Sequence, residues 1–159
     1  MKTICLYFEI HQIVHLKRYR FFDIGTDHYY YDDYENERTI RDIAERSYIP
    51  ALNTIGEMIK ENGKYFRVAF SLSGVGMEQL EQYAPEVLDK LVELNKTGCV
   101  EFLAEPYAHG LSALKDNTMF ALNVKNQCDK MVEYFGKRPT VLRNSSLIYS
   151  DDIGLQASE

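Results

Sequence analysis

The chain contains no tryptophan, only three cysteines among its 159 residues, and no apolar run long enough to cross a membrane. Cys5, Cys99 and Cys128 are odd in number and widely spaced, and they form neither a C-x-x-C pair nor a zinc-ligand spacing. The sequence therefore excludes a disulfide framework and a zinc finger. Because each cysteine stands among apolar residues, we expect buried, reduced thiols in a cytoplasmic protein.

An excess of basic residues is also missing, since the formal net charge is −6 and the pI is about 5.3. Proteins that bind nucleic acid or anionic lipid usually present a basic face, so we expect neither partner. The first apolar run, residues 4–8, is broken by Glu9 and is too short for a signal peptide. With 45% hydrophobic residues the chain has material for one core, and we expect residues 1–159 to form a single domain.

Strand-like and helix-like segments alternate along the chain. Residues 39–62 carry an apolar stripe at helical spacing, with a kink expected at Pro50 and an end at Gly63. Residues 78–95 are also helical, and Pro85 either kinks that helix or starts a second one. A third helix follows Asp116 or Asn117, and residues 15–38 form a long irregular excursion. Predicted strands cover residues 3–10, 65–72, 99–103 and 141–150. This order predicts an α/β fold with a parallel sheet.

Polar residues follow the predicted strands. In a parallel sheet the carboxyl ends of the strands lie at one edge, so side chains remote in sequence converge there. The residues expected at this edge are Glu9, His11, Gln12, Ser71, Ser73, Glu101, Glu105, Tyr107, His109, Arg143, Asn144, Ser145 and Ser146.

Four segments carry a resemblance to a known family. They read F-E-I-H-Q (residues 8–12), S-L-S-G-V followed by E-Q-L (71–80), E-F-L-A-E-P-Y-A-H (101–109) and R-N-S-S-L-I-Y (143–149). Together, and in this order, they resemble the motifs of the α-amylase-like branch of glycoside hydrolase family 57. The resemblance implies the N-terminal portion of an incomplete parallel (β/α)7 barrel, with about four βα units present. It also implies an α-glucan or maltooligosaccharide as ligand and no cofactor.

The same resemblance implies roles for individual residues. His11 and Gln12 correspond to a pair that helps bind sugar, and we expect Glu105, Tyr107, His109, Arg143 and Asn144 to contact substrate as well. Ser146 stands where the family has its nucleophilic glutamate. Retaining hydrolysis needs two carboxyl groups, and the acid/base residue is expected in a later motif, beyond a truncated fragment that ends at Glu159. We therefore expect an inactive chain that retains glucan binding.

Alternative interpretations remain open. His11 can be a histidine satisfied within the core, and Glu101 and Glu105 can be polar groups at a strand end. The aromatic residues at 29–34 suit stacking on sugar or packing on one another, and the acidic residues at 32–37 suit a solvated face. A metal-dependent polysaccharide deacetylase-like hydrolase would use His11, His15 and Asp23 as ligands. A non-catalytic glucan-binding or structural module is the third possibility, and the oligomeric state is left open.

Overall fold

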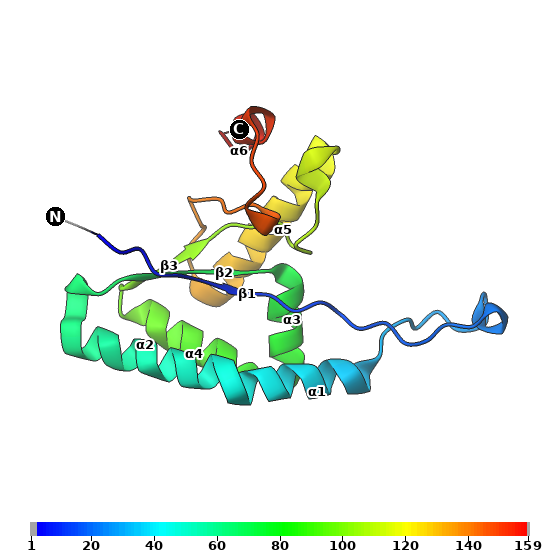
Figure 1. Cartoon of the computed structure of the whole chain (residues 1–159), viewed down its shortest axis with the longest axis horizontal. Helices are drawn as coiled ribbons and strands as arrows, with labels where there is room; N and C mark the ends of the chain where they lie inside the picture. Colours follow the sequence, from blue (N-terminus) through cyan, green and yellow to red (C-terminus); the bar gives the residue numbers. More distant parts are fainter. Residues whose placement is uncertain (1–2, 159) are drawn as a thin grey trace.

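The computed structural model describes residues 3–158, which build a three-stranded parallel sheet and the helices around it. The strand order is β1-β2-β3, and both pairs are parallel, as the alternation of segments predicts. The strands are β1 (Tyr7–Ile10), β2 (Val68–Leu72) and β3 (Val100–Leu103). The α-helices are α1 (Asp33–Ile43), α2 (Ile49–Asn62), α3 (Gly74–Tyr83), α4 (Pro85–Lys96), α5 (Asn117–Phe135) and α6 (Asp151–Ser158). In Figure 1, α1, α2 and α4 lie on one side of the sheet and α5 on the other.

The first helical region starts earlier and ends where expected. It begins at Asp33 because the Asp32 side chain accepts a hydrogen bond from the backbone N–H of Glu35. The kink expected at Pro50 is replaced by a π-helical stretch, η2 (Ala44–Tyr48), directly before α2. Such a wider turn accommodates a residue that lacks a backbone N–H. Gly63 ends the helix at a φ of 54°, which confirms its predicted role.

The predicted fourth strand, residues 141–150, is wrong. Only an isolated parallel bridge between Ala104 and Leu142 is formed there. After Arg143 the Asn144 side chain accepts a hydrogen bond from the N–H of Ser145, and a short 3-10 turn, η5 (Ser145–Leu147), follows. Ser146 has a φ of 53°, outside the extended region, so the backbone cannot continue along β3.

The two faces of the sheet differ in chemistry because successive side chains in a strand point to opposite sides. Phe8, Phe70 and Phe102 are register partners on one face, and Phe70 lies in the main core with residues of α1 to α5. Glu9 and Ser71 are paired on the opposite face. The polar face therefore runs toward the carboxyl edge, where the functional residues were expected.

The excursion between β1 and α1 forms an arm. In Figure 1 it extends away from the sheet beyond the start of α1. Its base is held by an antiparallel bridge between Leu16 and Tyr31, while Phe21 and Phe22 in its 3-10 turn, η1 (Phe21–Asp23), are strongly exposed. Tyr19 packs on Tyr30 with 4.9 Å between ring centroids, so part of its aromatic content packs within the arm.

The cysteine prediction holds in part. Cys99 and Cys128 are buried, but Cys5 is exposed, and all three thiols are free. Cys5 precedes β1, which is an edge strand and leaves its neighbourhood uncovered. Within residues 3–158, the helices are too short or too polar to traverse a lipid bilayer.

Candidate functional site

Five charged or titratable side chains meet at the carboxyl edge of the sheet. They come from β1 and the residue that follows it, from the segment after β3 and from the segment after α5. We call them the carboxyl-edge cluster: Glu9, His11, Glu105, His109 and Arg143. Parallel pairing brings them together from positions up to 134 residues apart.

The Glu9–Arg143 ion pair joins β1 to the segment after α5. Arg143 donates two hydrogen bonds to the Glu9 carboxylate, at 2.6 and 2.9 Å, in the forked geometry that guanidinium and carboxylate groups share. His109 Nδ1 lies 3.1 Å from the same carboxylate. The side chains of Arg143 and Glu9 are only 12% and 28% exposed, so water screens this pair less than a surface pair.

Glu105 lies beneath that pair and is fully buried. The Ser71 hydroxyl donates to its Oε2 at 3.0 Å, and Arg143 Nη1 is 3.8 Å away, whereas its Oε1 has no hydrogen-bond partner among the described residues. The pKa of Glu105 is raised to about 7, chiefly by burial and also by the charge of Glu9, while the hydrogen bond from Ser71 and the charge of Arg143 act to lower it. Near neutral pH this carboxyl group is therefore protonated in a large fraction of molecules.

The two histidines stack, with 4.6 Å between the ring centroids of His11 and His109. Ser73 accepts a hydrogen bond from the N–H of Gly76 and lies 2.7 Å from His11 Nδ1, to which its hydroxyl can donate. Burial lowers the pKa of His11, and His109 lowers it further. His11 is therefore a neutral imidazole at neutral pH, able to exchange hydrogen bonds with an uncharged ligand.

The sequence does not predict two residues that support the site. Tyr7 lies 2.6 Å from the Ser71 hydroxyl and extends the hydrogen-bonded chain that ends at Glu105. Its signal was available, because Tyr7 stands two residues before Glu9 and so points to the same face. Gln127 of α5 donates to the backbone carbonyl of Leu72 at 2.8 Å and is fully buried. Its position within an apolar helical stripe concealed it.

Several predicted site residues lie outside the cluster. Glu101 lies near the amino end of β3, in a different hollow, so its expected place at the carboxyl edge is wrong. Gln12 offers its backbone carbonyl to Gln79 at 2.8 Å. Tyr107 donates to Glu78 at 2.5 Å. The Asn144 side chain holds the turn after Arg143, because it donates to the carbonyl of Ile148 and accepts from the N–H of Ser145.

Ser146, the position aligned with the nucleophile, is exposed in this turn. Its neighbour Ser145 is buried, and the Ser145 hydroxyl has no hydrogen-bond partner among residues 3–158. Neither serine contacts a histidine or carboxylate through a side-chain hydrogen bond in this part of the chain. Activation of either hydroxyl as a nucleophile would need such a base.

A backbone contact fixes the loop that carries His109. The N–H of Val75 donates to the carbonyl of Tyr107, and the Tyr107 ring lies directly against Gly74 at the start of α3. A Cβ atom at position 74 would overlap this ring. The close approach therefore requires glycine.

Gly74→Ala is expected to lower the free energy of unfolding by about 1–3 kcal/mol, because the Tyr107 ring must move to admit the methyl group. Urea denaturation followed by circular dichroism measures this change. Gly56→Ala in α2 is the matched control, since its new Cβ would make only an ordinary 3.5 Å contact with Leu94. Equal stability of the two variants would contradict the tight packing at Gly74.

A metal ion could be held by part of the cluster. Glu9, Glu105 and His109 each offer a ligand atom, and these atoms lie within 4.8 Å of one another. Among the described residues this is the one group of three, so the alternative set of His11, His15 and Asp23 is not brought together. The Arg143 guanidinium already supplies positive charge to both carboxylates.

Comparison with known proteins gives the family. The family model for glycosyl hydrolase family 57 matches residues 5–157. A curated protein of Methanocaldococcus jannaschii, described as "Putative alpha-amylase", is 34% identical over 131 residues, which cover 82% of this chain and 28% of that protein. This chain thus spans little more than a quarter of that relative.

Solved structures agree on the fold. The 4-alpha-glucanotransferase of Thermococcus litoralis superposes with a TM-score of 0.71 at 16% identity, covering 97% of this chain and 20% of that one. The peptidoglycan deacetylase PdaC of Bacillus subtilis superposes with a TM-score of 0.51 at 21% identity, over 68% and 48%. These likenesses fit an α/β fold with a parallel sheet of the kind found in part of a barrel. Because the family model covers almost the whole sequence, the chain belongs to glycosyl hydrolase family 57.

Proposed function

We propose that this chain binds an α-glucan, such as a maltooligosaccharide, at the carboxyl-edge cluster and does not cleave it. Family membership supports the substrate class, since two similar proteins are described as "Putative alpha-amylase" and as a 4-alpha-glucanotransferase. We also propose that residues 1–159 form one domain, equivalent to the N-terminal part of an incomplete (β/α)7 barrel. The free thiols fit a cytoplasmic protein, which is the location that we propose.

The single observation that carries the proposal is the Glu9–Arg143–His109 arrangement. A partly exposed carboxylate, a guanidinium and an imidazole offer fixed acceptors and donors on one polar sheet face. Sugar hydroxyl groups both donate and accept, so such a mixed set suits them. The remaining proposed sugar contacts, Gln12, Tyr107 and Asn144, lie in the loops beside this face.

Absence of cleavage follows from the state of the carboxyl groups. Retaining hydrolysis needs one carboxylate free to attack and one carboxyl group in contact with the leaving oxygen. Glu9 is held by Arg143, and the Glu105 side chain is fully buried with its Oε2 in contact with Ser71. At position 146 a serine hydroxyl replaces the carboxylate, and no adjacent base among the described residues activates it.

Titration with maltopentaose tests the proposal. We expect saturable heat in calorimetry, and we expect His11→Ala to weaken binding about tenfold, the loss of one good hydrogen bond. His28→Ala, which removes an exposed histidine on the arm, should bind like the unaltered chain. Release of reducing ends during long incubation would overturn the non-catalytic part, and absence of saturable binding would overturn the glucan part.

A metal-dependent hydrolase of the deacetylase type is the second candidate. The three converging ligands Glu9, Glu105 and His109 favour it, and so does the fold shared with a peptidoglycan deacetylase. A stoichiometric zinc or manganese content after purification would support this candidate. Metal-free protein that binds maltopentaose would favour the glucan proposal.

A further inference from the structure

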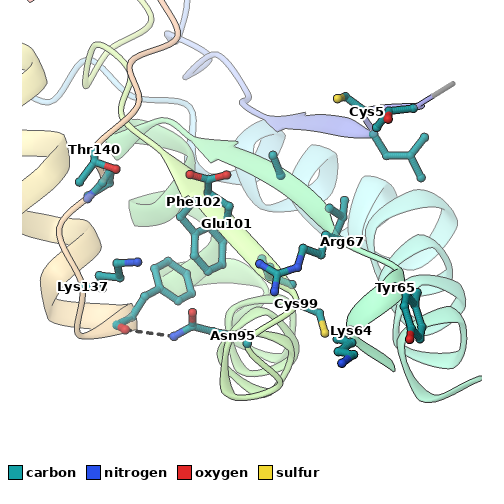
Figure 2. A pocket seen from close by; sticks show the side chains of 18 of the residues that line it. Cys5, Lys64, Tyr65, Arg67, Asn95, Cys99, Glu101, Phe102, Lys137 and Thr140 are labelled. Atoms are coloured by element: carbon teal, nitrogen blue, oxygen red, sulfur yellow. Dashed lines mark hydrogen bonds between the residues drawn. The ribbon is translucent and has the colours of Figure 1, made fainter. Parts of the chain in front are cut away.

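A hollow lies at the amino edge of the sheet, opposite the carboxyl-edge cluster. Its volume is about 580 Å³, within the range of small-molecule sites. It is lined by residues that precede or begin the three strands, including Leu6, Arg67 and Val100, and by the segment after α5 (Figure 2). Because the strands are parallel, this hollow and the carboxyl-edge cluster lie at different ends of the sheet.

The lining of this hollow is basic although the chain as a whole carries a formal charge of −6. Lys64, Arg67, Lys137 and Arg138 line it, and Glu101 is the one acidic residue there. Arg138 is paired with Asp129 outside the hollow. Within residues 3–158, the other three cations make no ion pair with an acidic side chain. In the view of Figure 2, Arg67 lies between Lys137 and Lys64.

The floor of the hollow is apolar and ordered. The rings of Phe102 and Phe135 stack with 4.0 Å between their centroids, and Asn95 donates a hydrogen bond to the backbone carbonyl of Phe135 at 3.0 Å. At the rim the Tyr65 ring is 88% exposed, with the Lys64 ammonium 5.6 Å from its centroid. The hollow thus combines unpaired positive charge with apolar and aromatic surface.

We propose that this hollow binds the phosphate monoester of a small organic molecule. A dianionic phosphate group would neutralise the unpaired cations, and its oxygens match the forked donors of Arg67. The organic half of the ester would lie on the apolar floor or against Tyr65. A nucleic-acid backbone does not fit, because the acidic remainder of the chain would repel a polyanion.

The experiment uses the whole chain and five probes: adenosine monophosphate, glucose 1-phosphate, inorganic phosphate, adenosine and glucose. We expect saturable binding of at least one ester, measured by calorimetry at low salt, with weaker binding of inorganic phosphate and none of the neutral parents. Preference for adenosine monophosphate would show that the organic half of the ester stacks on the Tyr65 ring. Preference for glucose 1-phosphate would show that the organic half of the ester is a sugar. Both results support the proposal, and added sodium chloride should weaken either interaction.

Variants locate the binding. Arg67→Ala and Lys137→Ala should each weaken ester binding about tenfold, as expected for the loss of one charge-assisted hydrogen bond. Lys115→Ala removes an exposed lysine outside this hollow and should have no effect. Both substitutions in the hollow lie on the surface, so unfolding curves should stay unchanged. Unaltered affinity in both variants, no saturable binding, or inorganic phosphate binding as tightly as the esters would overturn the proposal.

The outcome is independent of the proposed function. Maltopentaose binding depends on His11 at the other edge of the sheet, so Arg67→Ala should leave it intact. A chain that binds maltopentaose and no ester would disprove only the inference about the hollow.

Discussion

Replacing Arg143 by alanine is expected to lower the free energy of unfolding by about 2–3 kcal/mol. Removing one partner of a largely buried ion pair leaves the other charge without compensation. Here Glu9 would lose both hydrogen bonds from the guanidinium, at 2.6 and 2.9 Å, and keep only His109 nearby. Because Glu9 retains 28% exposure, water would recover part of the loss. Urea denaturation at pH 7 measures the change.

Arg138→Ala is the matched control for this prediction. Arg138 also forms an ion pair with a carboxylate, that of Asp129 at 2.8 Å, but both side chains are about half exposed. Exposed pairs contribute less than about 1 kcal/mol, so this variant should unfold almost like the unaltered chain. Arg143→Lys retains the charge without the forked geometry and should fall between the two. If Arg143→Ala and Arg138→Ala cost the same, the cluster does not hold the carboxyl edge together.

The effect of Arg143→Ala can also be measured on glucan binding. Glu9 is oriented by the guanidinium, and Arg143→Ala would free this carboxylate to move. We therefore expect loss of maltopentaose binding at temperatures where the variant is still folded. Binding that survives in the folded variant would show that Arg143 acts only on stability.

Helix positions were predictable because their signals are local. The apolar stripe, the cap at Asp116 and the glycine at position 63 each act within a few residues, and the structure confirms them. Pro85 starts a separate helix, one of the two outcomes that the sequence left open. The start of α1 differs from the prediction, because the acidic and aromatic composition before Thr39 is typical of a loop although Asp32 is a good cap.

The fourth strand failed for a different reason. Apolar residues at 141 and 142 have strand propensity, but a strand also needs a partner along its length. Only Leu142 finds one, at Ala104, before the Asn144 side chain and the positive φ of Ser146 turn the backbone. Propensity in two residues does not outweigh a turn that follows at once.

The composition of the site was predicted better than its contacts. Topology alone brings Glu9, Glu105 and Arg143 to one edge, and that convergence is confirmed. The pairing of Glu9 with Arg143 across 134 residues depends on side-chain geometry, which a sequence pattern does not contain. The burial of Gln127 depends on which carbonyl groups α5 covers.

Glu105→Gln is expected to remove a large part of the pH dependence of stability. In the folded chain burial raises the pKa of Glu105 from an ordinary 4.5 to about 7. Between these values the folded chain binds more protons than the unfolded chain, so the Glu105 contribution to stability falls as the pH rises through this window. A shift of this size corresponds to at most about 3 kcal/mol. Below pH 4.5 and above pH 7 the contribution is constant.

The titration of His11 changes the stability in the opposite direction, so its contribution must be separated from that of Glu105. Its pKa is lowered, chiefly by burial, so the unfolded chain binds the extra proton and this contribution rises with pH through the range just below 6.5. The difference between the unfolding free energies of Glu105→Gln and the unaltered chain cancels the His11 term. This difference should increase in favour of the variant by about 2–3 kcal/mol from pH 5 to pH 8.

Glu101→Gln is the control, because Glu101 lies on β3, four residues before Glu105, but is exposed. The slope that Glu105 contributes between pH 5 and pH 8 should remain in this variant. Parallel curves for Glu105→Gln as well would show that the buried carboxyl group is not the source of the slope. If the slope disappears only in Glu105→Gln, the proton held near neutral pH lies on Glu105, whose carboxyl group is 3.8 Å from Arg143.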